Sequence, residues 1–131
     1  MSTKLIAGSA MPEITLPTVS GGQAKIGGAK DRWQMIVVYR GLHCPICKSY
    51  TAKVEALKDE FDELDTDILF VSADNAEKAK SFANEVDLNL PVAYGISLVQ
   101  MRKLGLYVSD PRPTETDLPF PEPGLFVINE K

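Results

Sequence analysis

The feature that most constrains this chain is an apolar strand pattern that runs into a pair of cysteines and then into a helix pattern. Residues 36–39, Ile-Val-Val-Tyr, are typical of a buried strand, and Cys44-Pro45-Ile46-Cys47 follows shortly after. Pro45 suits the first turn of a helix because its missing N–H costs nothing there. The pattern therefore predicts a strand-to-helix junction with Cys44 at the helix N-terminus.

That position favours thiol chemistry. Unpaired backbone N–H groups and the positive end of the helix dipole stabilise an anion, and the thiolate is the reactive form of cysteine. We expect Cys44 to be the more acidic and more exposed thiol, and Cys47 to release a partner from a mixed disulfide on Cys44. The chain has only these two cysteines, so their spacing predicts reversible dithiol–disulfide exchange.

Three other interpretations of the pair stay open, and each has less support. A structural disulfide would close so short a loop that it would restrain little chain entropy. A zinc site would use Cys44, Cys47 and His43, but tetrahedral sites normally need a fourth ligand and the sequence has no second pair. The third alternative is a pair of inert core cysteines. We therefore expect no metal and no cofactor.

Composition limits the classes of partner. The 131 residues are 44% hydrophobic and 24% charged, which suits one globular domain over residues 1–131. The net charge of -4 argues against binding to nucleic acid or anionic membranes. The N-terminus lacks a signal-peptide pattern, and no apolar stretch approaches the roughly 20 residues of a membrane span. We expect a cytoplasmic protein, where closely spaced cysteines tend to be catalytic or metal-binding.

The pattern around the cysteines predicts further elements. Short strands over 13–16 and 24–26, joined by a turn with Gly21-Gly22, predict an N-terminal hairpin, and residues 35–39 predict a central strand. The helix after the motif carries an apolar stripe that we expect to pack in the core. Its members are Ile46, Tyr50, Val54, Leu57, Phe61 and Leu64.

A second strand and helix follow in the same order. Residues 68–72 predict a buried strand, and Asp74 with Glu77 predicts a capping box for the next helix. An extended piece over 90–92 and a helix over 96–104 come next. Alternating strands and helices imply parallel pairing with crossover connections. The fold class is therefore α/β, with a mixed central sheet flanked by helices.

The C-terminal part has two unusual features. Five prolines over 110–123 predict an irregular connection, either a surface linker or a wall beside the cysteines. The last strand, 124–128, has no following hairpin partner and no closing helix. We expect either a shortened form of the fold or a sheet edge covered by a second subunit in a homodimer.

Three stretches of this chain resemble the thioredoxin-like superfamily and, within it, the peroxiredoxin-like branch of alkyl-hydroperoxide-reductase and thiol-specific-antioxidant proteins. They are residues 8–17 (GSAMPEITLP), residues 39–47 (YRGLHCPIC) and residues 123–128 (PGLFVI). The resemblance implies a thioredoxin-like fold and a redox-active, antioxidant oxidoreductase. It also implies a cis Glu122-Pro123 bond lying against Cys44.

The resemblance assigns roles with some departures. If Cys47 matches the peroxide-reducing cysteine of the family, Cys44 stands at the family's threonine or serine and Arg40 at its proline. Pro123 then replaces the arginine that polarises peroxide. These departures favour disulfide exchange, with Cys44 as nucleophile and Cys47 as resolving thiol, near Arg40 and Pro123.

Two other functions are alternatives. In the first, the protein is a thiol peroxidase in which Cys47 reduces peroxide and Cys44 resolves. In the second, it is a non-catalytic redox-sensing or binding module. The expected partners are a protein disulfide or a peroxide as substrate, together with a cellular thiol reductant.

Overall fold

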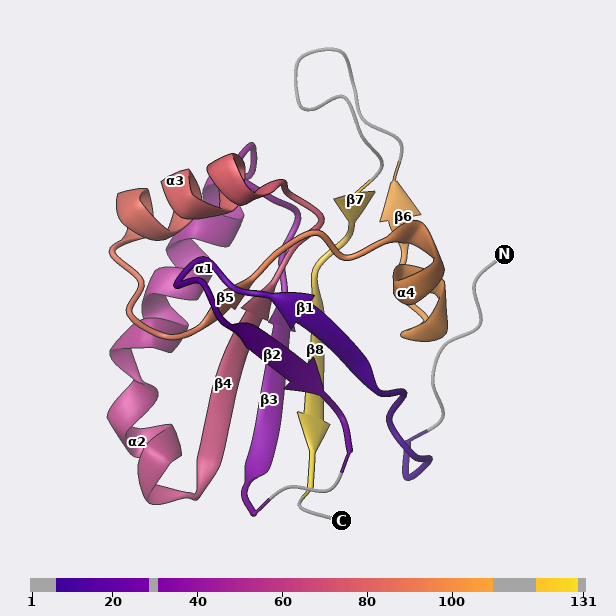
Figure 1. Ribbon diagram of the computed structural model, residues 1–131. Helices are drawn as coiled ribbons and strands as arrows, with labels where there is room; N and C mark the ends of the chain where they lie inside the picture. Colours follow the sequence, from indigo (N-terminus) through magenta and orange to yellow (C-terminus); the bar gives the residue numbers. More distant parts are fainter. Residues whose placement is uncertain (1–6, 29–30, 110–119, 130–131) are drawn as a thin grey trace.

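The computed structural model describes residues 7–28, 31–109 and 120–129. Its central sheet has the strand order β5-β4-β3-β8, with β3 parallel to β4, β4 parallel to β5, and β8 antiparallel to β3 (Figure 1). The bounds are β3 Trp33–Val38, β4 Thr66–Val71, β5 Val92–Ala93 and β8 Gly124–Ile128. This mixed sheet with flanking helices confirms the predicted α/β class.

Two small hairpins accompany the sheet. The N-terminal one joins β1 (Ile14–Pro17) to β2 (Gln23–Ile26) in antiparallel register, as the sequence predicted. The other pairs β6 (Val108–Ser109) with β7 (Phe120–Pro121) and was not predicted. Residues 110–119 of the proline-rich segment lie outside the described residues.

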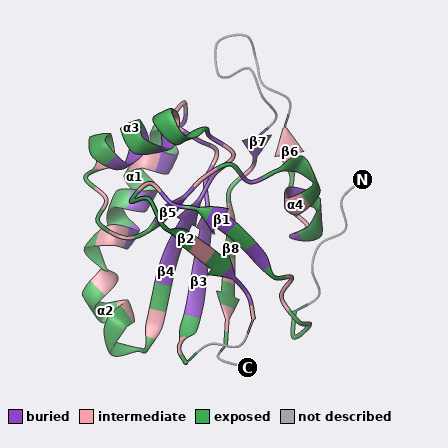
Figure 2. Ribbon diagram, viewed as in Figure 1, coloured by how far each residue is buried: buried purple, intermediate pink, exposed green. Residues whose placement is uncertain are grey.

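Alternation along β3 divides the core between the two faces of the sheet, because successive side chains of a strand point to opposite sides. One face carries Ile36 and Val38 and is covered by the β1–β2 hairpin and α4 (Leu98–Lys103). The other carries Met35, Val37 and Tyr39 and is covered by α1 (Pro45–Ala56) and α3 (Ala76–Val86). Both cysteines belong to this second face, and the central strands are buried over most of their length (Figure 2).

The predicted long helix is two helices, and most of its predicted core stripe is wrong. The helix bends at Leu57, where α1 ends and α2 (Lys58–Glu63) begins. Ile46 is 81% exposed and Tyr50 46% exposed. The buried residues of α1 are Cys47, Thr51 and Val54, of which only Val54 belongs to the predicted stripe. These also recur at helical spacing, so the sequence held two overlapping stripes and the sheet selected the one with the cysteine.

The caps of the later helices differ from prediction. The residue that caps α3 is Asn75, whose side chain accepts the Lys78 N–H at 2.9 Å. Asp74 was the predicted cap, but its carboxylate points to the loop before α1. In α4, Ser97 and Gln100 form a capping box.

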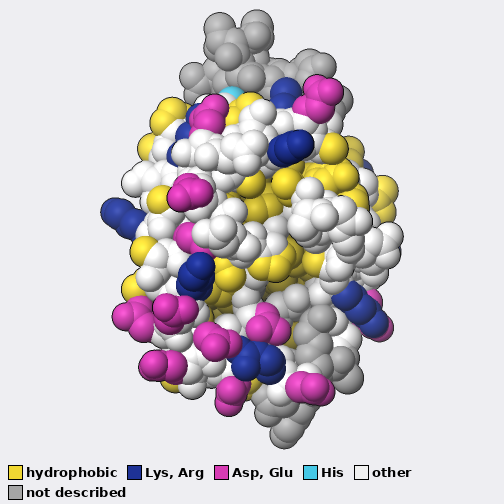
Figure 3. Space-filling model, turned by 60° about the vertical axis from the view of Figure 1, so that its left-hand side comes forward, with side chains coloured by type: hydrophobic (Ala, Val, Ile, Leu, Met, Phe, Trp, Pro, Cys, Tyr) yellow, Lys and Arg dark blue, Asp and Glu magenta, His cyan; other side chains and the backbone are white. Residues whose placement is uncertain are grey.

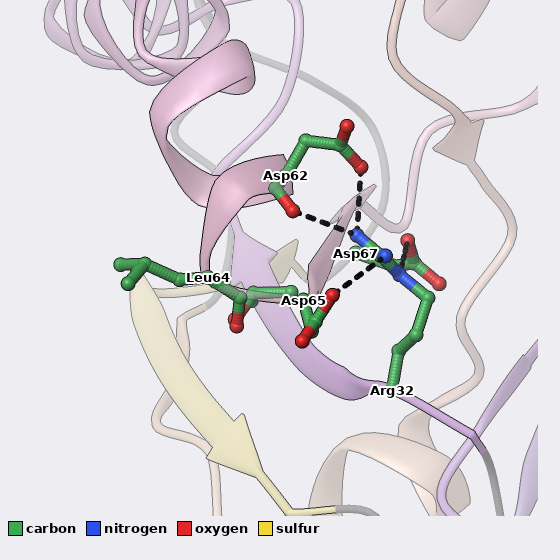
Figure 4. A network of polar contacts seen from close by, with 6 residues as sticks. Arg32, Asp62, Leu64, Asp65 and Asp67 are labelled. Carbon is green, nitrogen blue, oxygen red and sulfur yellow. Dashed lines mark hydrogen bonds and ion pairs between the residues drawn. The ribbon is translucent and has the colours of Figure 1, made fainter.

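An ion-pair cluster ties the start of β3 to the turn between α2 and β4 (Figure 4). The Arg32 guanidinium lies 2.7 Å from Asp62, 3.4 Å from Asp65 and 2.9 Å from Asp67. All three carboxylates are largely exposed. Their contribution to stability is therefore modest, because solvent and salt screen exposed pairs.

Two hollows lie away from the cysteines. In the described residues β8 pairs with β3 alone, as predicted, and a hollow of about 930 Å³ runs along its other edge. A cleft of about 450 Å³ is lined by residues of β2, β3, α2 and β4, including Lys25, Gln34 and Asp67. Figure 3 shows hydrophobic side chains in the middle of one face, with acidic side chains gathered in its lower part. No helix among the described residues could cross a membrane.

Candidate active site

Cys44 caps helix α1, as the sequence predicted. Its backbone is extended, and Pro45 is the first residue of the helix. The Cys44 sulfur accepts a hydrogen bond from the Cys47 N–H at 3.2 Å. An anion at this sulfur is stabilised by that donor and by the positive end of the helix dipole. The Cys44 sulfur thus lies at the N-terminus of α1 with a backbone donor directed at it.

The prediction that Cys44 is the more exposed thiol is wrong, because each cysteine is only 4% exposed. The reason is the covered face of the sheet: α1 and α3 enclose both cysteines together with Tyr39, Phe70 and Phe82. Both cysteines are free thiols. A small molecule reaches sulfurs in such a setting more easily than a folded protein does.

Cys47 is the thiol that keeps its proton. Burial, with a further contribution from neighbouring Cys44, raises the pKa of Cys47 to about 12. The backbone N–H of Arg40 donates to the Cys47 sulfur at 3.5 Å and opposes this shift only in part. At neutral pH Cys47 is therefore protonated, and it lies beside the helix-capping sulfur of Cys44.

The loop between β3 and α1 is held from behind by Asp74. Its Oδ2 accepts the Leu42 N–H at 2.8 Å, and its side chain is buried. Gly41 has φ of 138°, and a Cβ added there would lie 2.8 Å from Asp74 Oδ1 and 3.2 Å from His43 Nδ1. Glycine at position 41 therefore lets the backbone approach the carboxylate. Burial raises the pKa of Asp74, although the Leu42 N–H, Lys78 and His43 oppose that rise.

The same loop is covered from the front by the β6–β7 hairpin. The Phe120 ring meets the His43 ring edge-on at 4.7 Å and lies 4.8 Å from the Arg40 guanidinium carbon. Arg40 Nε lies 3.1 Å from Glu122 Oε1, and the Ser109 hydroxyl donates to Glu122 Oε2 at 2.9 Å. The structure thus brings Arg40, Cys44 and Cys47 together, as the site prediction requires.

Pro123 does not have the predicted geometry. The described residues contain no cis peptide bond, so Glu122-Pro123 is trans. Pro123 is exposed and lines the hollow beside β8 with Trp33 and Tyr107. The side chains that this segment turns toward the cysteine loop are those of Phe120 and Glu122, because the short β6–β7 hairpin places them there.

Sequence reasoning missed Asp74, Phe120 and Glu122 as site residues. A usable signal existed for Asp74, since it follows β4, and parallel strands β3 and β4 end at the same edge of the sheet. Phe120 and Glu122 had no such signal, because the pairing of β6 with β7 spans the proline-rich segment. Among the described residues no three His, Cys, Asp or Glu side chains gather around a possible metal.

The family model named AhpC/TSA matches residues 7–131. The chain belongs to the AhpC/TSA family. Members are thiol-dependent oxidoreductases of the peroxiredoxin-like type, so the protein is an enzyme of that class and the resemblance seen in the sequence is confirmed. The comparison with curated proteins found no match.

Several solved structures share this fold. A peroxiredoxin-like protein from Aquifex aeolicus superposes with a TM-score of 0.80 at 24% identity, over 98% of this chain and 72% of that one. Peroxidoxin BcpB from Mycobacterium tuberculosis gives 0.77 at 18% identity, over 99% and 80%. Peroxiredoxin Q of Xanthomonas campestris, in a cysteine-to-serine mutant, gives 0.76 at 18%, over 99% and 82%.

Proposed function

We propose that this protein is a thiol peroxidase that reduces a hydroperoxide with the Cys44–Cys47 pair. The observation that carries the proposal is the shared site of the two sulfurs: both are buried, and the Cys47 N–H donates to the Cys44 sulfur. A peroxide needs only a narrow path to such a site. A protein disulfide needs an exposed sulfur, which neither residue offers.

The reaction begins at Cys44. Its thiolate attacks the terminal oxygen of ROOH, the O–O bond breaks, and the Cys47 thiol supplies the proton that leaves with ROH. The products are a sulfenic acid on Cys44 and a thiolate on Cys47. That thiolate then attacks the sulfenic sulfur, forms the Cys44–Cys47 disulfide and releases hydroxide. Two electrons pass from the dithiol to the peroxide.

Peroxide as substrate replaces disulfide exchange as the leading interpretation. The AhpC/TSA family match and the peroxiredoxins among the similar structures support it. Arg40 carries a positive charge near Cys47, its backbone N–H donates to the Cys47 sulfur, and its guanidinium pairs with Glu122. The Arg40 side chain stabilises the negative charge that develops on oxygen as the O–O bond breaks, a role that fixed hydrogen-bond donors usually have in active sites.

The cycle closes when a thiol reductant returns the disulfide to the dithiol. We place this cycle in the cytoplasm, because a reducing compartment supplies such thiols and keeps both cysteines free between turnovers. The proposal requires no metal or organic cofactor.

The test compares two substrates in one preparation. Hydrogen peroxide and a scrambled-disulfide protein are supplied separately, with dithiothreitol as reductant, and both turnover rates are measured. The wild type is expected to consume peroxide faster than it exchanges disulfides. Faster disulfide exchange would return the assignment to the oxidoreductase of the sequence prediction, and no turnover of either substrate would favour a non-catalytic module.

Serine variants test the order of attack. Cys47→Ser is expected to accumulate a sulfenic acid on Cys44, which dimedone labelling and mass spectrometry detect. Cys44→Ser is expected to lose peroxide consumption. Ser49→Ala, an exposed change on the same helix, is the matched control and should act like wild type. A sulfenic acid on Cys47 in the Cys44→Ser protein would reverse the roles, as the family position of Cys47 suggests.

A further inference from the structure

We infer that Asp74 is a positioning residue for the reactive cysteine, acting through the backbone of the loop that precedes Cys44. The inference rests on the proposed function only in taking Cys44 as the reacting thiol. The Asp74 carboxylate accepts a hydrogen bond from the loop, at the Leu42 N–H. It acts on the chain between β3 and α1, through the Leu42 N–H and against Gly41.

The first argument is the hydrogen bond itself. Asp74 is 8% exposed, and its Oδ2 lies 2.8 Å from the Leu42 nitrogen. An N–H bonded to a carboxylate is a strong contact, and a partner left unsatisfied after its loss carries a desolvation cost. Leu42 lies only two residues before the Cys44 cap. A shift of its amide therefore moves the cap.

The second argument is that Asp74 is itself fixed on both sides. Its own N–H donates to the Ser72 hydroxyl at 3.3 Å, and its carbonyl accepts the Gly95 N–H at 2.9 Å. Ser72 is fully buried at the end of β4. These contacts fix the carboxylate relative to the end of β4, and the loop before Cys44 binds to the carboxylate in that fixed position.

The third argument comes from what the loop sets in place. The Gly41 carbonyl accepts the Cys44 N–H at 3.1 Å, and the Arg40 N–H donates to the Cys47 sulfur at 3.5 Å. Both contacts belong to the short segment that Asp74 holds. One carboxylate therefore controls the approach of a donor to Cys47 and the orientation of the Cys44 cap.

The variants separate the hydrogen bond from the charge. Asp74→Asn keeps an oxygen that accepts the Leu42 N–H and removes the charge, whereas Asp74→Ala removes both. Asp67→Asn is the matched control, since Asp67 is an exposed aspartate bound to Arg32 at the opposite end of β4. All three are made in the Cys47→Ser background so that Cys44 alone reacts.

The readout is the rate of Cys44 alkylation by iodoacetamide as a function of pH, with thermal unfolding measured in parallel. Asp74→Ala is expected to change the rate at neutral pH by roughly tenfold and to move the midpoint of the profile, because small displacements of a reacting group have large kinetic effects. Asp74→Asn and Asp67→Asn are expected to stay within about twofold of the parent. The assay needs no peroxide, so it succeeds or fails independently of the peroxidase proposal.

Two results would overturn the inference. One is a folded Asp74→Ala protein whose profile coincides with the parent while only its melting temperature falls, which marks a role in stability alone. The other is a folded Asp74→Asn protein with a displaced midpoint, which assigns the effect to charge. If Asp74→Ala does not fold, Gly41→Ala replaces it, because the added methyl would lie 2.8 Å from Asp74 Oδ1 and push the loop away from the carboxylate. A displaced profile in the folded Gly41→Ala protein supports the inference, and a profile that coincides with the parent refutes it.

Discussion

Two carboxylates hold the cysteine loop from opposite sides, and they do so in different ways. Asp74 lies behind the loop, is buried and binds a backbone N–H. Glu122 lies in front, has a side chain 33% exposed and binds the Arg40 side chain. The inner contact fixes the path of the main chain, whereas the outer one fixes only where a side chain rests. Asp74, which follows β4, therefore determines the backbone conformation of the loop, whereas the β6–β7 hairpin covers the loop.

The energies of the two contacts should differ for the same reason. A buried group bonded to a buried N–H leaves an unsatisfied donor when it is lost. A partly exposed ion pair is screened by solvent and contributes little on its own. In front of the loop the stronger contact is the aromatic one, since the buried Phe120 ring packs on the His43 ring and the Arg40 guanidinium.

The largest expected effect is therefore that of Phe120→Ala. Truncating a buried phenylalanine costs about 3 kcal/mol or more of unfolding free energy, through lost burial and a residual cavity. Urea unfolding measures it. Tyr107→Ala, an exposed aromatic just before β6, is the control and should cost less than about 0.5 kcal/mol. Equal losses for the two variants would mean that the cover is not packed on the loop.

Gly41→Ala tests the inner side and ranks second. The added methyl meets Asp74 Oδ1 at 2.8 Å, and φ is 138°, so a loss of about 1–3 kcal/mol from backbone strain is expected before the collision is counted. Gly95→Ala is the matched control, because its φ is also positive, at 74°, but its methyl would meet open space. The excess loss of Gly41→Ala over Gly95→Ala measures the collision. No excess would show that the loop is free to move away from Asp74.

The pH dependence of stability isolates the charge on Asp74. Burial raises the pKa of Asp74 above the usual 3.8. Between pH 3.8 and the raised pKa, the folded state holds more protons than the unfolded state, so the free energy of unfolding falls as pH rises. Asp74→Asn lacks this fall, and its advantage over wild type should grow with pH above 3.8. Urea unfolding across that range checks it. An advantage that shrinks with rising pH would contradict the buried-carboxylate account.

Among the described residues, His43, Lys78 and the Tyr39 hydroxyl are titratable groups that interact with this carboxylate. The same comparison in a His43→Ala background removes the histidine's own titration. Tyr39 stays neutral throughout the acidic range, because burial raises its pKa further above the usual value near 10.

The sequence predicted the inner half of this arrangement better than the outer half. Apolar runs identified β3 and β4, and the proline between the cysteines identified the start of α1, because these signals are local. The burial of Cys44 was not predictable from its place in the chain, since residues far along the sequence, in β4, α3 and β5, belong to the core cluster that encloses it. The stripe of Ile46 and Tyr50 misled for the same reason: periodicity alone does not say which face meets the sheet.

The outer half depends on contacts between residues far apart in sequence. Arg40 meets Glu122 only because β8 returns antiparallel to β3 and the chain before it pairs with β6. No local pattern encodes such a meeting. Pro123 misled because its place in the superfamily pattern implied a cis bond, whereas the residue that reaches the loop is the preceding glutamate.

Glu122→Gln gives the smallest expected effect and the sharpest contrast with Asp74. The amide keeps a partner for the Ser109 hydroxyl and loses the ion pair with Arg40, so the cost should stay below about 1 kcal/mol and shrink further in high salt. Urea unfolding at low and high ionic strength measures this cost. The control is Asp62→Asn, which likewise removes one partly exposed ion pair with an arginine. A salt-independent loss equal to that of Gly41→Ala would show that the outer carboxylate also fixes the main chain, and the distinction between the two sides of the loop would then be wrong.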